Sequence, residues 1–165
     1  MALIVEIIIG IIIAWAIYVL IHRMVVQRAT RIVRHSAQAE TDVAVKAAVQ
    51  RLVNQDVLTE DEGTLPASVT VADVWGRGVM AFEYTLQVGM AAERRLPQLE
   101  AAMNAALASY SADHQVQACV AGSAFVVSDI WVYDDQLHLD VAYLMNESTV
   151  EYLKDLKKLN DPAVQ

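Results

Sequence analysis

The sequence predicts an α+β protein: an N-terminal transmembrane helix that extends into an amphipathic helix, followed by a small antiparallel-sheet domain. Three observations predict it. An apolar run of nineteen residues, 3–21, contains a single charged side chain, Glu6. No Gly or Pro interrupts the chain between Ile11 and Gln55. Beyond residue 68 the apolar residues change from helical spacing to alternation, which is typical of strands that bury one face.

The apolar run, LIVEIIIGIIIAWAIYVLI, predicts a membrane anchor over residues 1–22. At about 1.5 Å per residue its helix would be roughly 28 Å long, close to the ~30 Å hydrocarbon core of a bilayer. Ile and Val favour strands in water, but a single span in lipid must satisfy its own backbone hydrogen bonds, which a helix does. No basic segment precedes the run and no small-residue cleavage site follows it, so we expect an uncleaved anchor.

Charge is distributed unevenly and predicts an orientation. Residues 1–35 hold four Arg and one Glu, a net of +3, whereas residues 36–165 hold eight Lys or Arg and nineteen Asp or Glu, a net of −11. Because basic residues collect on the cytoplasmic side of a span, we expect the N-terminus outside and the C-terminal domain on the cytoplasmic, matrix or stromal side. The residues expected to contact lipid headgroups are Arg23, Arg28, Arg31 and Arg34. The acidic domain argues against nucleic acid as a partner.

Residues 23–57 are expected to form a basic juxtamembrane segment that continues into an amphipathic helix. The apolar residues at helical spacing near its end are Val45, Val49, Leu52 and Val53. The next segment, LTEDEGTLPAS at 58–68, is acidic and contains Gly63 and Pro66. We therefore expect a loop there.

The remaining α+β domain, 69–165, is predicted to contain two ββα units, at 69–113 and 123–160. In the first unit, VTVADVW and VMAFEYTLQV are separated by GRG, which indicates a hairpin. In the second, two alternating strands flank the dipeptide Asp134-Asp135, which indicates a two-residue turn.

Each unit is expected to end in a helix. Pro97 suits the first turn of a helix that runs to about Ser111. Near the C-terminus, Ser148 and Glu151 stand at the spacing of a capping box, which predicts the start of the last helix. The apolar face predicted for that helix consists of Val150, Leu153, Leu156 and Leu159.

The two hairpins contain related pentapeptides, VADVW at 71–75 and VSDIW at 127–131. One interpretation is an internal duplication of a ββα unit. The other is that two amphipathic hairpins resemble each other because both follow the pleat of a strand, and two units are too few to indicate a repeat protein.

Strand alternation places the Asp and Trp of both pentapeptides on one mixed face of the sheet. In the expected register Asp129 lies opposite Asp140, while Val126 and Ser128 belong to the apolar face. Either the helix at about 40–55 covers the mixed face, or this face contacts a partner or another copy, since aromatic residues dominate such surfaces. The residues expected to contact a partner are Trp75, Trp131, Tyr133 and, within the anchor, Glu6.

The sequence contains no pattern that indicates catalysis, a cofactor or a metal, so we expect none of these. Asp129, Asp140 and His138 could together hold a cation or act as an acid and base, but the sequence supplies no further ligand. Cys119 is the only cysteine, so no disulfide forms within the chain.

The N-terminal third, MALIVEIIIGIIIAWAIYVLI with a helix to about residue 55, a loop and then an antiparallel sheet, resembles a type IV pilin or pseudopilin. The resemblance implies that Glu6 would pair with the amine of a neighbouring subunit during filament assembly. The chain departs from that family because it has no basic leader ending in Gly, its Glu6 stands one position late, and its Arg residues favour the opposite topology.

These observations predict a non-enzymatic, single-pass membrane protein that serves as an accessory or scaffold subunit. It would help to assemble or stabilise a membrane complex through protein contacts, with membrane lipids and other subunits, or copies of itself, as partners. The alternatives are a pilin-like filament subunit and a membrane-tethered domain that binds a small ligand or a cation.

Overall fold

The structure is a computed structural model that describes residues 2–71, 78–88 and 92–160; for residues 2–5, 24–29, 92 and 160 it describes the backbone alone. The chain divides into two compact units, Met1–His35 and Ser36–Gln165, which are described separately. The first helix, α1 (Ala2–Asn54), contributes residues to both.

The first unit is helical throughout its described residues. Within it, the segment Glu6–Arg23 is long and apolar enough to cross a membrane, and none of its residues is buried inside the protein. Ile11, Trp15 and Tyr18, for example, are 63%, 67% and 65% exposed. An unburied apolar helix near an N-terminus is either a membrane anchor or a signal sequence.

The second unit contains a four-stranded antiparallel sheet with the strand order β1-β2-β4-β3. Its strands are β1 (Val69–Thr70), β2 (Ala81–Gln87), β3 (Phe125–Tyr133) and β4 (Gln136–Tyr143). Its helical elements, besides the end of α1, are η1 (Ala92–Arg95), α3 (Leu96–Asp113) and α4 (Glu147–Asn160). The α+β class expected from the sequence is therefore confirmed.

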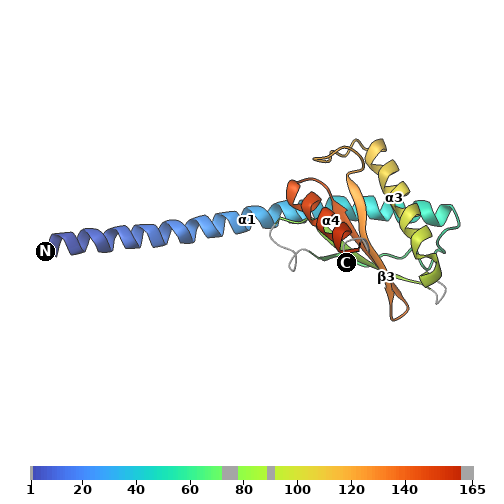
Figure 1. The fold of residues 1–165 in the computed structure, drawn as a ribbon, viewed down its shortest axis with the longest axis horizontal. Coiled ribbons are helices and arrows are strands. Elements are labelled where there is room, and N and C mark those ends of the chain that lie inside the picture. Colours follow the sequence, from blue (N-terminus) through green and yellow to red (C-terminus); the bar gives the residue numbers. More distant parts are fainter. Residues whose placement is uncertain (1, 72–77, 89–91, 161–165) are drawn as a thin grey trace. The chain divides into compact units, whose positions relative to one another are not determined.

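The sheet is covered by helices on both faces. The end of α1 and α3 pack on one face, around Phe82 and Phe125, which are both fully buried. Helix α4 packs on the other face, where Leu153 contacts the cluster that includes Ala142. Figure 1 shows α4 in front of the sheet and the cyan part of α1 behind it.

The end of α1 forms the amphipathic helix that the sequence predicts. Its buried residues recur at helical spacing: Ala37, Thr41, Ala44, Val45, Ala48, Val49 and Leu52. Three of them are alanines, and small side chains on the buried stripe let the helix backbone approach the sheet closely. Of the two alternatives for the mixed face, coverage by this helix is wrong, because the helix packs on the apolar face with Tyr84 and Leu139.

The second hairpin follows the expected register only near its turn. Pairs from Asp129↔Asp140 to Tyr133↔Gln136 are as predicted, and both turn residues have positive φ, 50° and 59°. A bulge between Val127 and Asp129 then shifts the pairing so that Val127 lies opposite Val141. As a result Val127 is buried in the main core and Val126 packs on the α4 side, which corrects the predicted apolar face.

The first hairpin is described only in part. Strand β1 has two residues and pairs with β2, with Val69 opposite Glu83. The GRG turn up to Arg77, and with it Trp75, falls in 72–77, outside the described residues.

The chain order of the second unit is ββα followed by ββα, but α3 and α4 lie on opposite faces of the sheet. A two-fold axis normal to the sheet, which would exchange β2 with β4, would leave both helices on the same face. The packing of the helices therefore does not repeat, and internal duplication stays a prediction that rests on the sequence.

Helix α4 begins at Glu147, so its N-cap lies two residues before the predicted cap, Ser148. The side chain of Asn146 accepts a hydrogen bond from the backbone N–H of Thr149 at 2.9 Å, so Asn146 is the N-cap and the prediction of Ser148 is wrong. Asn146 also donates to the carbonyl of Gly78 at 2.8 Å, which ties the start of α4 to the segment before β2.

Candidate functional site

A row of three carboxylates crosses the sheet on the face that α4 packs against. Asp140 on the central strand β4 lies opposite Glu83 of β2 on one side and opposite Asp129 of β3 on the other. Directly opposite residues in an antiparallel pair have Cβ atoms about 4.5–5.5 Å apart, and like charges there are destabilising. The sequence predicted the Asp129–Asp140 pair, whereas Glu83 joins it through the pairing of β2 with β4.

A histidine stands beside this row. His138 lies on β4 two residues before Asp140, and its Nδ1 is 2.6 Å from Oε1 of Glu83. Its ring stacks on Trp131, with the ring centroids 5.0 Å apart and the planes 9° from parallel. His138 therefore pairs with Glu83 rather than with Asp140.

Asp140 is the buried member of the row. It is 6% exposed, and its Oδ1 has no hydrogen-bond partner among the described residues. The pKa of Asp140 is raised to about 7: burial is the largest cause, the negative charges of Glu83 and Asp129 add to it, and His138 opposes them. A carboxyl group with this pKa is about half protonated near pH 7.

The cation-binding hypothesis for Asp129, Asp140 and His138 can be compared with this geometry. Among the residues that the structure describes, no group of three or more His, Cys, Asp or Glu side chains is arranged to hold a metal ion. The three side chains lie on one face of the sheet, as expected.

Three of the four predicted partner-contact residues lie in the part of the chain that the structure describes. Trp131 is half-buried against His138, and Tyr133 at the end of β3 is 72% exposed. Glu6 lies on α1 in the first unit and is exposed. Trp75 lies outside the described residues.

The four arginines expected at lipid headgroups all lie on α1. Arg23 and Arg31 are exposed, Arg34 is partly buried, and the side chain of Arg28 is outside the described part. Because the helix is continuous from Ala2 to Asn54, these residues keep helical spacing immediately after the apolar segment.

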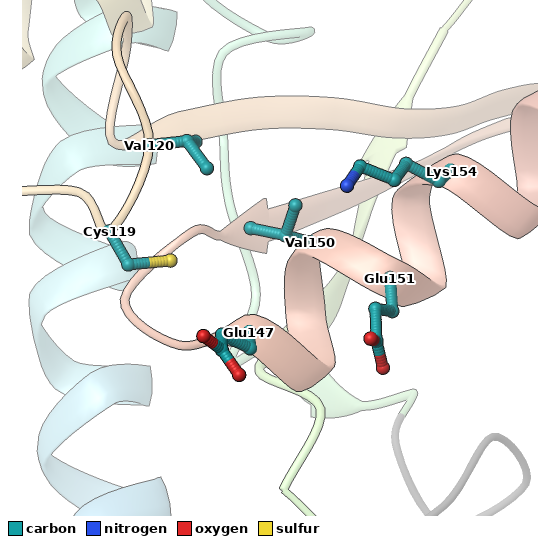
Figure 2. Close-up of a pocket in the computed structure, with 6 residues that line it drawn as sticks. All are labelled: Cys119, Val120, Glu147, Val150, Glu151 and Lys154. Atoms are coloured by element: carbon teal, nitrogen blue, oxygen red, sulfur yellow. The ribbon is translucent and has the colours of Figure 1, made fainter.

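A groove that the sequence did not reveal lies between α4 and the loop before β3. Figure 2 shows its lining: Cys119 and Val120 come from the loop, and the other residues come from α4. Its volume is about 350 Å³, and the lining residues are Cys119, Val120, Glu147, Val150, Glu151 and Lys154. Figure 2 also shows the Lys154 amine pointing back toward the loop at Val120.

A second hollow of about 260 Å³ adjoins the first and shares Val120, Val150 and Lys154 with it. Its other lining residues are the apolar Val126, Leu144 and Leu153 and the basic Lys157. The two hollows together form a groove with apolar lining residues, in which Glu147 and Glu151 come from the start of α4 and Lys154 and Lys157 from further along it. This arrangement suits a peptide segment. The only feature of the sequence that indicated the groove is the apolar stripe of the last helix.

Comparisons with protein families, with curated proteins and with solved structures found no match to this chain.

Proposed function

We propose that this protein is a single-pass membrane protein whose α+β domain acts as a non-enzymatic accessory subunit of a membrane complex. The observation that carries the proposal is the segment Glu6–Arg23, an apolar helix none of whose residues is buried by the rest of the chain. Leaving so many large side chains in water is unfavourable by about 25 cal/mol for each Å² of apolar surface. A lipid environment removes that cost.

The charges that follow the segment support an orientation. Arg23 and Arg31 are exposed on the same helix just beyond the apolar residues, where anionic headgroups would attract them by about 1 kcal/mol each. With the basic residues on the inner side, the domain faces the cytoplasm, matrix or stroma.

The surface of the domain supports a role in protein contacts. The groove beside α4 is lined by apolar and charged side chains, and the exposed ring of Tyr133 and the half-buried ring of Trp131 lie on the same face of the sheet as α4. Aromatic residues and apolar pockets rimmed by charges are common features of interaction surfaces. We assign the groove as the main contact with a partner subunit and the aromatic residues as a secondary one.

The test is purification of the full chain in mild detergent, with a photo-crosslinking amino acid in place of Val120 in the groove. We expect a native mass above that of the 18.2 kDa chain in its micelle, and a crosslink to a second polypeptide. The matched control carries the same amino acid in place of Glu100, which is exposed on α3. A chain that is monomeric in every mild detergent, with equal crosslinking from both positions, contradicts the proposal.

A pilin-like filament subunit is the second candidate, and one observation favours it. The same continuous helix is apolar and unburied over Glu6–Arg23 and packs on an antiparallel sheet over its last turns. The two candidates differ in the side of the membrane on which the domain lies, because a filament subunit exposes its domain outside the cell.

A further inference from the structure

The row of Glu83, Asp140 and Asp129 cannot hold three negative charges at low cost. Adjacent strands are about 4.8 Å apart, so Asp140 has a carboxylate on each side. Glu83 has His138 at 2.6 Å, and Asp129 is exposed to water and accepts the backbone N–H of Ile130 at 2.9 Å. Asp140 is buried, and its Oδ1 has no hydrogen-bond partner among the described residues.

This orphaned oxygen distinguishes the row from an ordinary acidic patch on a sheet. A buried carboxylate without a hydrogen bond is costly to leave ionised, and the group becomes neutral instead. The buried Nε2 of His138 also has no partner among the described residues. A proton is the species that can remove the charge without needing more space.

We propose that Asp140 is a proton-binding site, and that its proton keeps α4 and β3 packed on this face of the sheet. Helix α4 contributes Tyr152, which is 7% exposed and packs with Val79 and Ala81. Burial raises the pKa of the Tyr152 phenol, a hydrogen bond with Ser128 lowers it, and the charges of Asp140 and Asp129 raise it. Among the residues that the structure describes, the titratable groups facing Asp140 are therefore Glu83 from β2, Asp129 from β3, His138 from β4 and Tyr152 from α4.

The direction in which pH changes the stability of the fold follows from the raised pKa of Asp140. The pKa of Asp140 is raised to about 7 in the folded protein, first by burial and then by its acidic neighbours, against roughly 4 in an unfolded chain. The folded state then binds the proton more tightly, so stability falls as pH rises from about 4 to about 7 and stays low above that value.

The proton also bears on the proposed contact surface. Tyr152 is followed on α4 by Leu153 and Lys154, which line the groove. Loosening of α4 after Asp140 ionises would widen or close this groove, so binding of a partner there would depend on pH. This consequence rests on the proposed function, whereas the proton site itself does not.

The direct experiment is a carboxyl ¹³C NMR titration of the full chain in detergent micelles, with Asp140→Asn to assign the signal. We expect the Asp140 carboxyl to titrate with a midpoint of about 7. A midpoint near 4, the value of a solvated aspartate, overturns the proposal. A midpoint that moves when Mg²⁺ or Ca²⁺ is added also overturns it, because the occupant would then be a cation.

The second experiment measures amide hydrogen exchange of α4 and β3 at pH 6 and pH 8, corrected for intrinsic exchange. In the wild-type chain we expect the opening equilibrium to rise roughly tenfold between these values, and in Asp140→Asn to stay nearly constant. Asp155→Asn, at an exposed carboxylate of α4, should behave as wild type. Equal pH dependence in wild type and Asp140→Asn contradicts the role of Asp140 in holding α4 and β3.

Discussion

The phenol oxygen of Tyr84 donates a hydrogen bond to Oδ1 of Asp42 at 2.8 Å, which joins the central strand β2 to the end of α1. The hydroxyl of Ser68 donates to the same carboxylate oxygen at 2.6 Å, so the residue before β1 is fixed to the same point. Burial raises the pKa of Tyr84, and Asp42 raises it further through the hydrogen bond and its charge. This small network fixes the position of the helix on the sheet.

We expect Tyr84→Phe to lower the free energy of unfolding by about 1.5 kcal/mol, because a hydrogen bond to a charged acceptor is lost inside the domain. Urea unfolding of the full chain in micelles, followed by circular dichroism, measures the change. Tyr143→Phe is the matched control: its hydroxyl donates to Glu40 at 3.2 Å, and Glu40 is exposed, so we expect a smaller loss. Equal losses in the two variants would contradict the assigned role of Asp42.

The start of α4 gives a second prediction. Asn146→Ala removes two hydrogen bonds, the one that Asn146 accepts from the Thr149 N–H to cap α4 and the one that it donates to Gly78. We expect the free energy of unfolding to fall by about 1–2 kcal/mol. Ser148→Ala, at the position favoured by the sequence pattern, should change stability by less than about 0.5 kcal/mol, since Ser148 is exposed. Thermal unfolding of both variants checks this, and a larger loss for Ser148→Ala would mean that the cap is misassigned.

Trp131→Ala tests whether the aromatic face is core or contact surface. The ring stacks on His138 and is only half-buried, so we expect a loss of about 0.5–1.5 kcal/mol with the fold retained. If the ring also contacts a partner, the native mass of the complex in mild detergent should fall while the circular dichroism spectrum stays unchanged. Complete unfolding of the variant would show instead that Trp131 belongs to the core.

The natural cysteine reports the side of the membrane on which the domain lies. Cys119 is the only cysteine of the chain and is exposed in the structure. We expect a membrane-impermeant maleimide to label it only after the cells are permeabilised, whereas Ala2→Cys in a Cys119→Ser background should be labelled in intact cells. Labelling of Cys119 in intact cells would favour the filament subunit and contradict the inward orientation.

The sequence revealed those features of the fold that arise from local patterns. Helical spacing located the stripe of Val45 and Val49, which is buried as expected. The dipeptide Asp134-Asp135 located the two-residue turn, because Asp tolerates the positive φ that such a turn requires. These features depend on a few neighbouring residues, so one sequence is enough to predict them.

Features that depend on contacts between distant segments were missed. Nothing near Ser128 marks the bulge, which contains no Gly and becomes visible only when β3 is paired with β4. The pattern of Ser148 and Glu151 is local, whereas the observed cap, Asn146, also depends on a hydrogen bond to the distant Gly78. Glu83 and Asp140 are 57 residues apart in the sequence and meet only because β2 pairs with β4. The groove forms only because the loop at Cys119 and Val120 lies beside α4.

The central claim is that residues 6–23 lie in a membrane as an uncleaved helix, and fractionation of the full-length protein at alkaline pH tests it most directly. We expect the wild-type chain to stay in the membrane pellet after carbonate treatment, to dissolve only in detergent, and to have the intact mass of about 18.2 kDa. A variant with Ile9→Arg and Ile13→Arg, at two exposed positions of the apolar helix, should move to the supernatant. Recovery of the wild-type chain in the carbonate supernatant, or shortened by loss of its N-terminal segment, would contradict the account.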